Sequence, residues 1–174
     1  MHALKMLWIT FLNLCCLRLG PGDLPASSVL LSLTLILYAI TSSALSLEQL
    51  TVTAAILSSL VEISLLVALT ASLLYFTHYS ARIIQTLTAL AGTSILLGIL
   101  SILPFLWLHH AKINHDDIGI PLLLLIGLMI WSWVVHAHIL RHALAVSFFT
   151  GFIITIVTFY CIISVLEQLF PSPG

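Results

Sequence analysis

The 174-residue chain has very little charge: five Lys or Arg and six Asp or Glu, which together are 6% of its residues. A soluble domain carries about a quarter charged residues. A hydrophobic fraction of 61% would leave a large apolar surface in contact with water. The shortage of charge therefore excludes a soluble globular domain and indicates an integral membrane protein. The few cations are scattered along the chain, which argues against a nucleic-acid partner.

Cysteine is also scarce, and the sequence lacks the motifs of catalytic and metal sites. The three cysteines include the neighbours Cys15 and Cys16, which are poor disulfide partners by geometry, and no CxxC pair is present. There is no set of nucleophile, base and orienting residue, no phosphate-binding glycine loop and no metalloprotease motif. The sequence therefore predicts a protein that is not an enzyme and has no bound cofactor.

Long apolar runs are what the sequence does contain. A transmembrane helix needs about 20 mostly apolar residues. Backbone polar groups in hydrocarbon must be satisfied internally, and long runs without alternating polarity do this as helices. The predicted fold class is all-α, a polytopic membrane protein with a five-helix transmembrane bundle that forms one domain over residues 1–174. The expected spans are 27–47, 51–76, 84–108, 119–140 and 143–170.

Residues 1–19 form a shorter apolar run that Lys5, Asn13 and Arg18 interrupt. We interpret this run as an interfacial helix at the membrane surface. A cleaved signal peptide is the alternative, because Lys5 precedes an apolar core, but no small-x-small cleavage site follows. Two prolines and two glycines within residues 20–25 predict a turn that ends this helix.

The positions of the cations predict the orientation of the chain in the membrane. With five spans, one side receives only Lys112. The other side receives four cations, which are Lys5, Arg18, Arg82 and Arg141. Because loops on the cytoplasmic side are enriched in Lys and Arg, we expect a cytoplasmic N-terminus and a C-terminus outside.

One acidic residue, Glu62, interrupts the apolar stretch "SSLVEISLLVAL" of residues 58–69. It lies about 11 residues from the outer end of its span, or roughly 16 Å deep at 1.5 Å per residue. An ionised carboxylate there costs at least about 2.5–3.5 kcal/mol, so we expect Glu62 to be protonated and to face the bundle. Thr93 and Ser94, at similar depth in the third span, complete an expected intramembrane polar cluster. Three roles remain open for Glu62: a polar clamp between helices, a proton or cation relay, and contact with a ligand.

The eight histidines fall largely into two groups at opposite ends of the fourth predicted span. The outer group has residue types that bind divalent metals, but its spacing is loose, so we expect a solvated loop and no metal site. Its members are His109, His110, His115, Asp116 and Asp117. The inner group lies at headgroup depth, where we expect contact with lipid phosphate or a partner. That predicted inner-face contact consists of Arg18, Arg82, His138, Arg141 and His142.

Three stretches carry a resemblance to a known group of proteins: "CLRLGPGDLPAS" at 16–27, "RIIQTLTALAGTSILL" at 82–97 and "HAHILRHALAVS" at 136–147. They resemble an uncharacterised family of small proteobacterial inner-membrane proteins, which is similar to the Yip-domain group of five-span membrane proteins. The resemblance implies a location in the bacterial inner membrane. It also implies a role as a multispanning scaffold or interaction protein, and it assigns no functional residues.

These observations together predict a non-enzymatic membrane protein that binds lipid, other membrane proteins or a second copy of itself. One alternative is a small proton- or cation-coupled transport component that uses Glu62. Another is a hydrophobic accessory subunit of a membrane complex.

Overall fold

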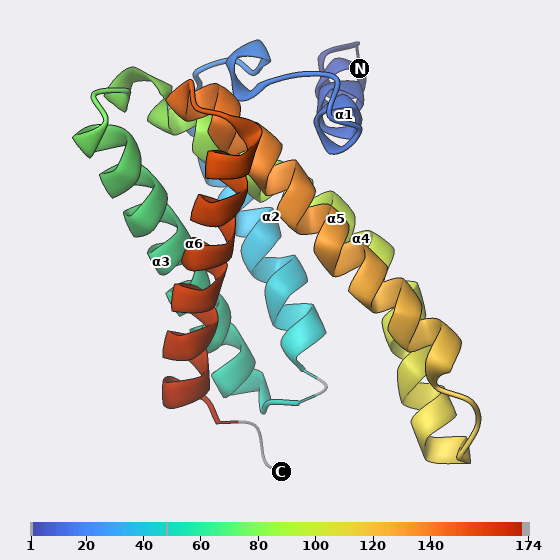
Figure 1. Cartoon of the computed structure of the whole chain (residues 1–174). Helices are drawn as coiled ribbons and strands as arrows, with labels where there is room; N and C mark the ends of the chain where they lie inside the picture. Colours follow the sequence, from blue (N-terminus) through green and yellow to red (C-terminus); the bar gives the residue numbers. More distant parts are fainter. Residues whose placement is uncertain (1, 48, 172–174) are drawn as a thin grey trace.

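The computed structural model describes residues 2–47 and 49–171 of the chain (Figure 1). Glu48, in the polar break between the first two predicted spans, lies outside this range, as does the side chain of Lys5. The described residues form helices joined by short connections, without strands. In chain order they are α1 (His2–Cys15), the single turn η1 (Pro21–Asp23), α2 (Ser28–Ser46), α3 (Val52–Phe76), the single turn η2 (Ser80–Arg82), α4 (Ile83–Asn114), α5 (Gly119–Leu144) and α6 (Phe148–Leu169).

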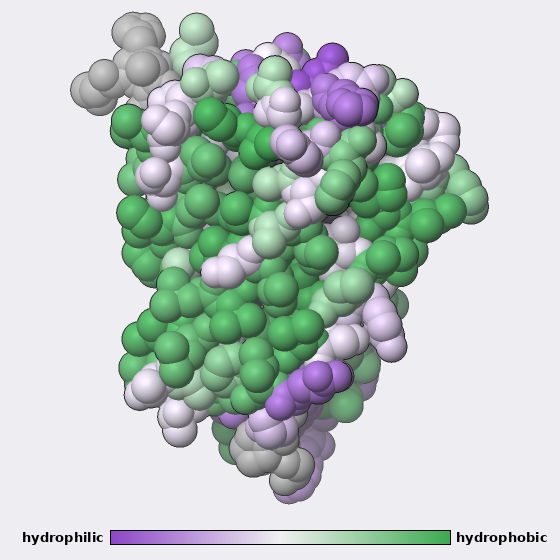
Figure 2. Space-filling model, turned by 90° about the vertical axis from the view of Figure 1, so that its left-hand side faces the viewer, coloured by the Kyte–Doolittle hydropathy of each residue, from purple (hydrophilic) through white to green (hydrophobic). Residues whose placement is uncertain are grey.

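Five helices of the described chain, α2 to α6, are long and apolar enough to cross a membrane. This confirms the predicted all-α, five-helix membrane protein. Helix α1 is too short to span. It lies at the end of the bundle where the α3–α4 and α5–α6 connections also lie (Figure 1), and we call this the α1 end. Hydrophobic side chains cover most of the face in Figure 2, and hydrophilic ones gather near its two ends.

Two helices extend further than the apolar runs predicted. Helix α4 continues to Asn114 rather than 108, and α5 continues to Leu144 rather than 140, so Arg141 and His142 lie in a helical last turn. Each helix ends at a left-handed residue, His115 with φ 57° and Ala145 with φ 55°. Polar side chains at a helix end reach the headgroup region, and cations there are favoured by the helix dipole, so loss of hydrophobicity does not end the helix.

Hydroxyl side chains define where three of the spans begin. Ser27 accepts a hydrogen bond from the backbone N–H of Leu30, Thr51 from that of Ala54, and Ser147 from that of Thr150. Each bond satisfies one of the backbone donors left free at a helix start. The last span therefore begins at 148, five residues later than its apolar run predicts.

The helices pack most closely at the α1 end. The antiparallel pair α4 and α5 diverges from α3 and α6 toward the opposite end (Figure 1), whereas α2 stays packed on α4, where a Cβ atom at Gly98 would lie 3.0 Å from the side chain of Thr41. Two glycines allow close helix crossings. A Cβ atom at Gly151 of α6 would lie 2.7 Å from the carbonyl oxygen of Ala137 in α5, and one at Gly92 of α4 would lie 2.1 Å from the ring of Phe11 in α1.

Candidate functional sites

A pocket of about 580 Å³ lies at the α1 end, between the α1–α2 connection, the start of α4 and the last turns of α5. We call it the basic pocket. It brings together all five residues of the predicted inner-face contact. Its ionisable lining residues are Arg18, Arg82, His138, Arg141, His142 and Asp23. With neutral histidines the lining carries a net charge of +2, because three arginines face one aspartate.

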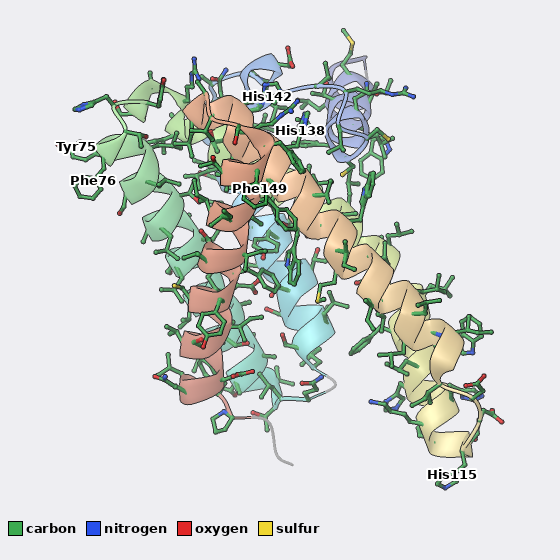
Figure 3. The ribbon with its side chains drawn as sticks, viewed as in Figure 1. Tyr75, Phe76, His115, His138, His142 and Phe149 are labelled. Carbon is green, nitrogen blue, oxygen red and sulfur yellow. The ribbon has the colours of Figure 1, made fainter. Side chains whose placement is uncertain are left out.

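The α1–α2 connection forms one wall of the basic pocket and is tied to the helices beneath it. His138, which is only 5% exposed, places its Nε2 atom 3.0 Å from the carbonyl oxygen of Leu19. Because a carbonyl only accepts, this nitrogen is the donor. The side-chain amide of Gln85 donates to the carbonyl oxygen of Leu24 at 2.7 Å. Figure 3 shows His138 and His142 together beneath this connection. His138 is therefore a positioning residue of the pocket.

Arg82 joins the start of α4 to the end of α5. Its Nη1 atom donates to the carbonyl oxygens of His142 at 3.1 Å and Ala143 at 3.0 Å. These carbonyls belong to the last turn of α5, where carbonyl oxygens have no N–H partner within the helix. The guanidinium also stacks 4.9 Å from the ring centre of Tyr79. Arg82 therefore stabilises the fold as well as contributing charge to the pocket.

Arg141 contributes charge with fewer partners. Its Nη2 atom lies 3.3 Å from Nε2 of His142, and its guanidinium carbon lies 5.9 Å from the ring centre of Phe148. Its Nε atom is buried and has no hydrogen-bond partner among the described residues. An arginine presents five donors in a planar fork that matches phosphate and carboxylate. The basic pocket thus combines arginine side chains with excess positive charge, an arrangement that suits an anion.

A second pocket, of about 420 Å³, is an open groove between the helices and is lined by residues from all five spans. We call it the polar crevice. Its lining residues come from α4 and α5 on one side and from α2, α3 and α6 on the other. Its polar lining residues are Tyr38, Thr41, Ser42, Ser46, Glu62, Ser94, Ser101, Ser132 and His136.

Glu62 is held by α2. One carboxylate oxygen accepts a hydrogen bond from the hydroxyl of Tyr38 at 2.5 Å, and the other accepts from the hydroxyl of Ser42. The expected partner Thr93 is not part of this cluster: it is fully buried, and its hydroxyl donates to the carbonyl oxygen of Ala89 at 2.9 Å. Ser94 does line the crevice, where its hydroxyl lies 3.1 Å from Nε2 of His136. Depth along a span places residues at one level, but it does not say which neighbour each residue faces.

The polar groups of the crevice form two hydrogen-bonded sets, Glu62 with Tyr38 and Ser42, and Ser94 with His136. Both sets line the crevice, and α2, α3, α4 and α5 contribute to them. Tyr38, Ser42 and His136 were not expected in this cluster. A signal for the first two exists in the sequence: they lie four residues apart on one helix face, and a tyrosine hydroxyl inside a span needs a partner.

Removing the Tyr38 hydroxyl tests how much its hydrogen bond to Glu62 contributes to stability. We expect Tyr38→Phe to lower the free energy of unfolding by about 0.6–2 kcal/mol, the range for polar contacts between transmembrane helices. Thermal unfolding in a mild detergent, followed by tryptophan fluorescence, measures the effect. Tyr160→Phe is the matched control, because Tyr160 is 72% exposed. Equal melting temperatures for the two variants would contradict a stabilising role for this hydrogen bond.

The outer histidines and aspartates lie far from both cavities. His109 and His110 are helical, whereas residues 115–117 form the exposed tip of the α4–α5 hairpin, with His115 at the end opposite His138 in Figure 3. His110 pairs with Asn114 at 2.8 Å, and Asp117 accepts from the backbone N–H of Gly119 at 2.8 Å. Within the described part of the chain, no group of three or more His, Cys, Asp or Glu is placed to hold a metal ion.

No protein-family model, curated protein or solved structure matches the chain. The two cavities therefore provide the basis for assigning a function.

Proposed function

We propose that the protein is a non-enzymatic multispanning membrane protein whose basic pocket binds the phosphate of an anionic lipid. The observation that carries this proposal is the convergence of three arginines and two histidines, from α5, the start of α4 and the α1–α2 connection, on one pocket. Residues far apart in the sequence supply these charges, so helical periodicity alone does not account for their meeting.

The location of the pocket favours a lipid headgroup as its ligand. It lies at the α1 end of the five apolar helices, and the connection that follows α1 forms part of its lining. Basic residues near an anionic membrane surface contribute about 1 kcal/mol each to lipid attraction. Arginine adds a geometric match, since its fork donates two parallel hydrogen bonds to phosphate oxygens.

Lipid binding is tested with the double variant Arg18→Gln and Arg141→Gln, which leaves the structural Arg82 in place. The measurement is the affinity of phosphatidylglycerol for the purified protein, by native mass spectrometry in neutral-lipid nanodiscs. Loss of two cations at about 1 kcal/mol each predicts an affinity roughly 30-fold lower. Lys112→Gln is the matched control, because it removes one exposed cation at the opposite end of α4, and we expect it to leave the affinity unchanged.

Two results would count against this function. An unchanged affinity in the double variant would show that the pocket does not bind the lipid. A comparable loss with Lys112→Gln would show attraction by overall charge rather than by a site. If lipid affinity persists while a co-purifying membrane protein is lost from the double variant, the pocket belongs to a protein partner.

A further inference from the structure

The polar crevice combines groups that the lipid-binding role does not use. Its lining contains one carboxylate, that of Glu62, and two aromatic rings, those of Tyr38 and Phe159. No lysine or arginine is among its lining residues. Glu62, Tyr38 and Phe159 are each half-buried, so they border the cavity rather than being sealed within a core. The crevice is therefore a groove that opens between the helices, with acidic and aromatic groups on its walls.

Glu62, which we expect to be protonated when the crevice is empty, has no lysine or arginine partner among the lining residues. The hydroxyls of Tyr38 and Ser42 donate to its two oxygens, which supports a negative charge without neutralising it. An intramembrane carboxylate is costly unless a cation or a proton accompanies it. The remaining ionisable lining residue is His136, whose Nε2 atom is already paired with Ser94. A bound cation would take the place of that proton and compensate the carboxylate charge.

We propose that the polar crevice binds a hydrophobic organic cation, of the quaternary ammonium or phosphonium class. Its charge would lie against Glu62 and against the faces of Tyr38 and Phe159, because aromatic rings attract cations through their negative faces. Its apolar groups would lie against the aliphatic lining, which includes Leu97, Leu128 and Met129. A cavity of about 420 Å³ falls within the range of pockets that hold drug-sized ligands, about 300–1,000 Å³.

Other occupants fit these walls less well. An anion would meet Glu62 without any basic lining residue except His136. A metal ion would require several ligands, and the described residues contain no suitable group. A purely structural role explains the bonds among Glu62, Tyr38 and Ser42, but it does not explain the cavity beside them. Nor does it explain Ser132, which lines the crevice one turn before His136 and has no hydrogen-bond partner in the described part of the chain.

Two ions of matched shape and opposite charge test the proposal on the unaltered protein. Tetraphenylphosphonium and tetraphenylborate each carry four phenyl rings around a single charge. Isothermal titration in a neutral detergent, against a protein-free detergent blank, gives the affinity of each ion. We expect the protein to bind the phosphonium at least about tenfold more tightly than the borate, since like-charge contact is strongly unfavourable. Equal affinities, or a preference for the borate, would overturn the proposal without any substitution.

Substitution of Glu62 then locates the site. Glu62→Gln keeps the shape of the side chain and removes its charge, so the phosphonium affinity should fall by about tenfold or more. Glu167→Gln is the matched control: it removes an exposed carboxylate in the last turn of α6, outside the crevice lining, and the affinity should not change. Retention of full affinity by a folded Glu62→Gln protein would refute the site. Should that variant aggregate, Glu62→Asp provides the second test, because it retains the charge and must retain the preference for the phosphonium.

Discussion

Replacement of Gly151 by leucine is expected to lower the free energy of unfolding by roughly 3 kcal/mol, the upper end of the usual cost of overpacking. A Cβ atom at this position would lie 2.7 Å from the carbonyl oxygen of Ala137 and 3.2 Å from the backbone nitrogen of Arg141. Both neighbours are backbone atoms of α5, so no side chain can rotate to make room. Helices α5 and α6 would have to separate.

The matched control for this substitution is Gly127→Leu, in the first half of α5. A Cβ atom at Gly127 meets no other atom within 4 Å, so the same change in size should have little effect. Thermal unfolding in mild detergent compares the two variants directly. The close crossing of α5 and α6 would be wrong if both leucine variants melted at the same temperature as the unaltered protein.

The second large effect is expected at Gly92, where α1 packs on α4. A Cβ atom there would lie 2.1 Å from the Phe11 ring, and Phe11 is only 9% exposed, so leucine at position 92 should displace α1.

The reactivity of the Cys15 thiol, on α1, reports this displacement. Burial, together with the neighbouring Cys16, raises the pKa of the Cys15 thiol from 9.0 to about 11. Because the thiolate is the reactive form, Cys15 should react slowly with maleimide at pH 8 while α1 is docked.

Release of α1 should return the Cys15 pKa toward its ordinary value. In a background with Cys16 and Cys161 replaced by serine, we expect Gly92→Leu to raise the labelling rate of Cys15 by tenfold or more at pH 8, because each unit of pKa changes the thiolate fraction about tenfold. Adding Phe11→Ala to Gly92→Leu exchanges the large and small side chains and should restore slow labelling. Fast labelling of Cys15 in the protein that retains Gly92 would argue against the packing of α1 on α4. An unchanged labelling rate in the Gly92→Leu variant would argue against it as well.

The basic pocket shows which features of a site can be predicted from the order of residues along the chain. Arg18 and Arg82 each precede a predicted span, and Arg141 follows the end of one. Because each span crosses the membrane, these three boundaries are expected on the same side. Their common side is therefore predictable from the sequence. Their convergence on one pocket is not, since it depends on the α1–α2 connection folding back over α5, where Leu19 accepts the hydrogen bond of His138.

For Glu62, the sequence predicts the depth in the membrane but not the hydrogen-bond partners. Its depth in the second span follows from counting residues, and so does the cost of its charge. Its partners do not follow, because residues at one depth surround each helix on every side. Packing of α3 against α2 selects Tyr38 and Ser42, and it leaves Thr93 bonded within its own helix.

The sequence by itself determined the lipid environment, the five spans and the end of the bundle at which the arginines lie. These properties depend on the hydrophobicity and length of each apolar run, because a run of about 20 residues crosses the bilayer as a helix and the position of a residue in the run gives its depth. Only the tertiary structure decided which helix faces which, where α4 and α5 end, and that a polar crevice lies beside Glu62. Those features depend on the rotation of each helix about its axis and on close contacts such as Gly151 with Ala137, which side-chain packing sets in three dimensions.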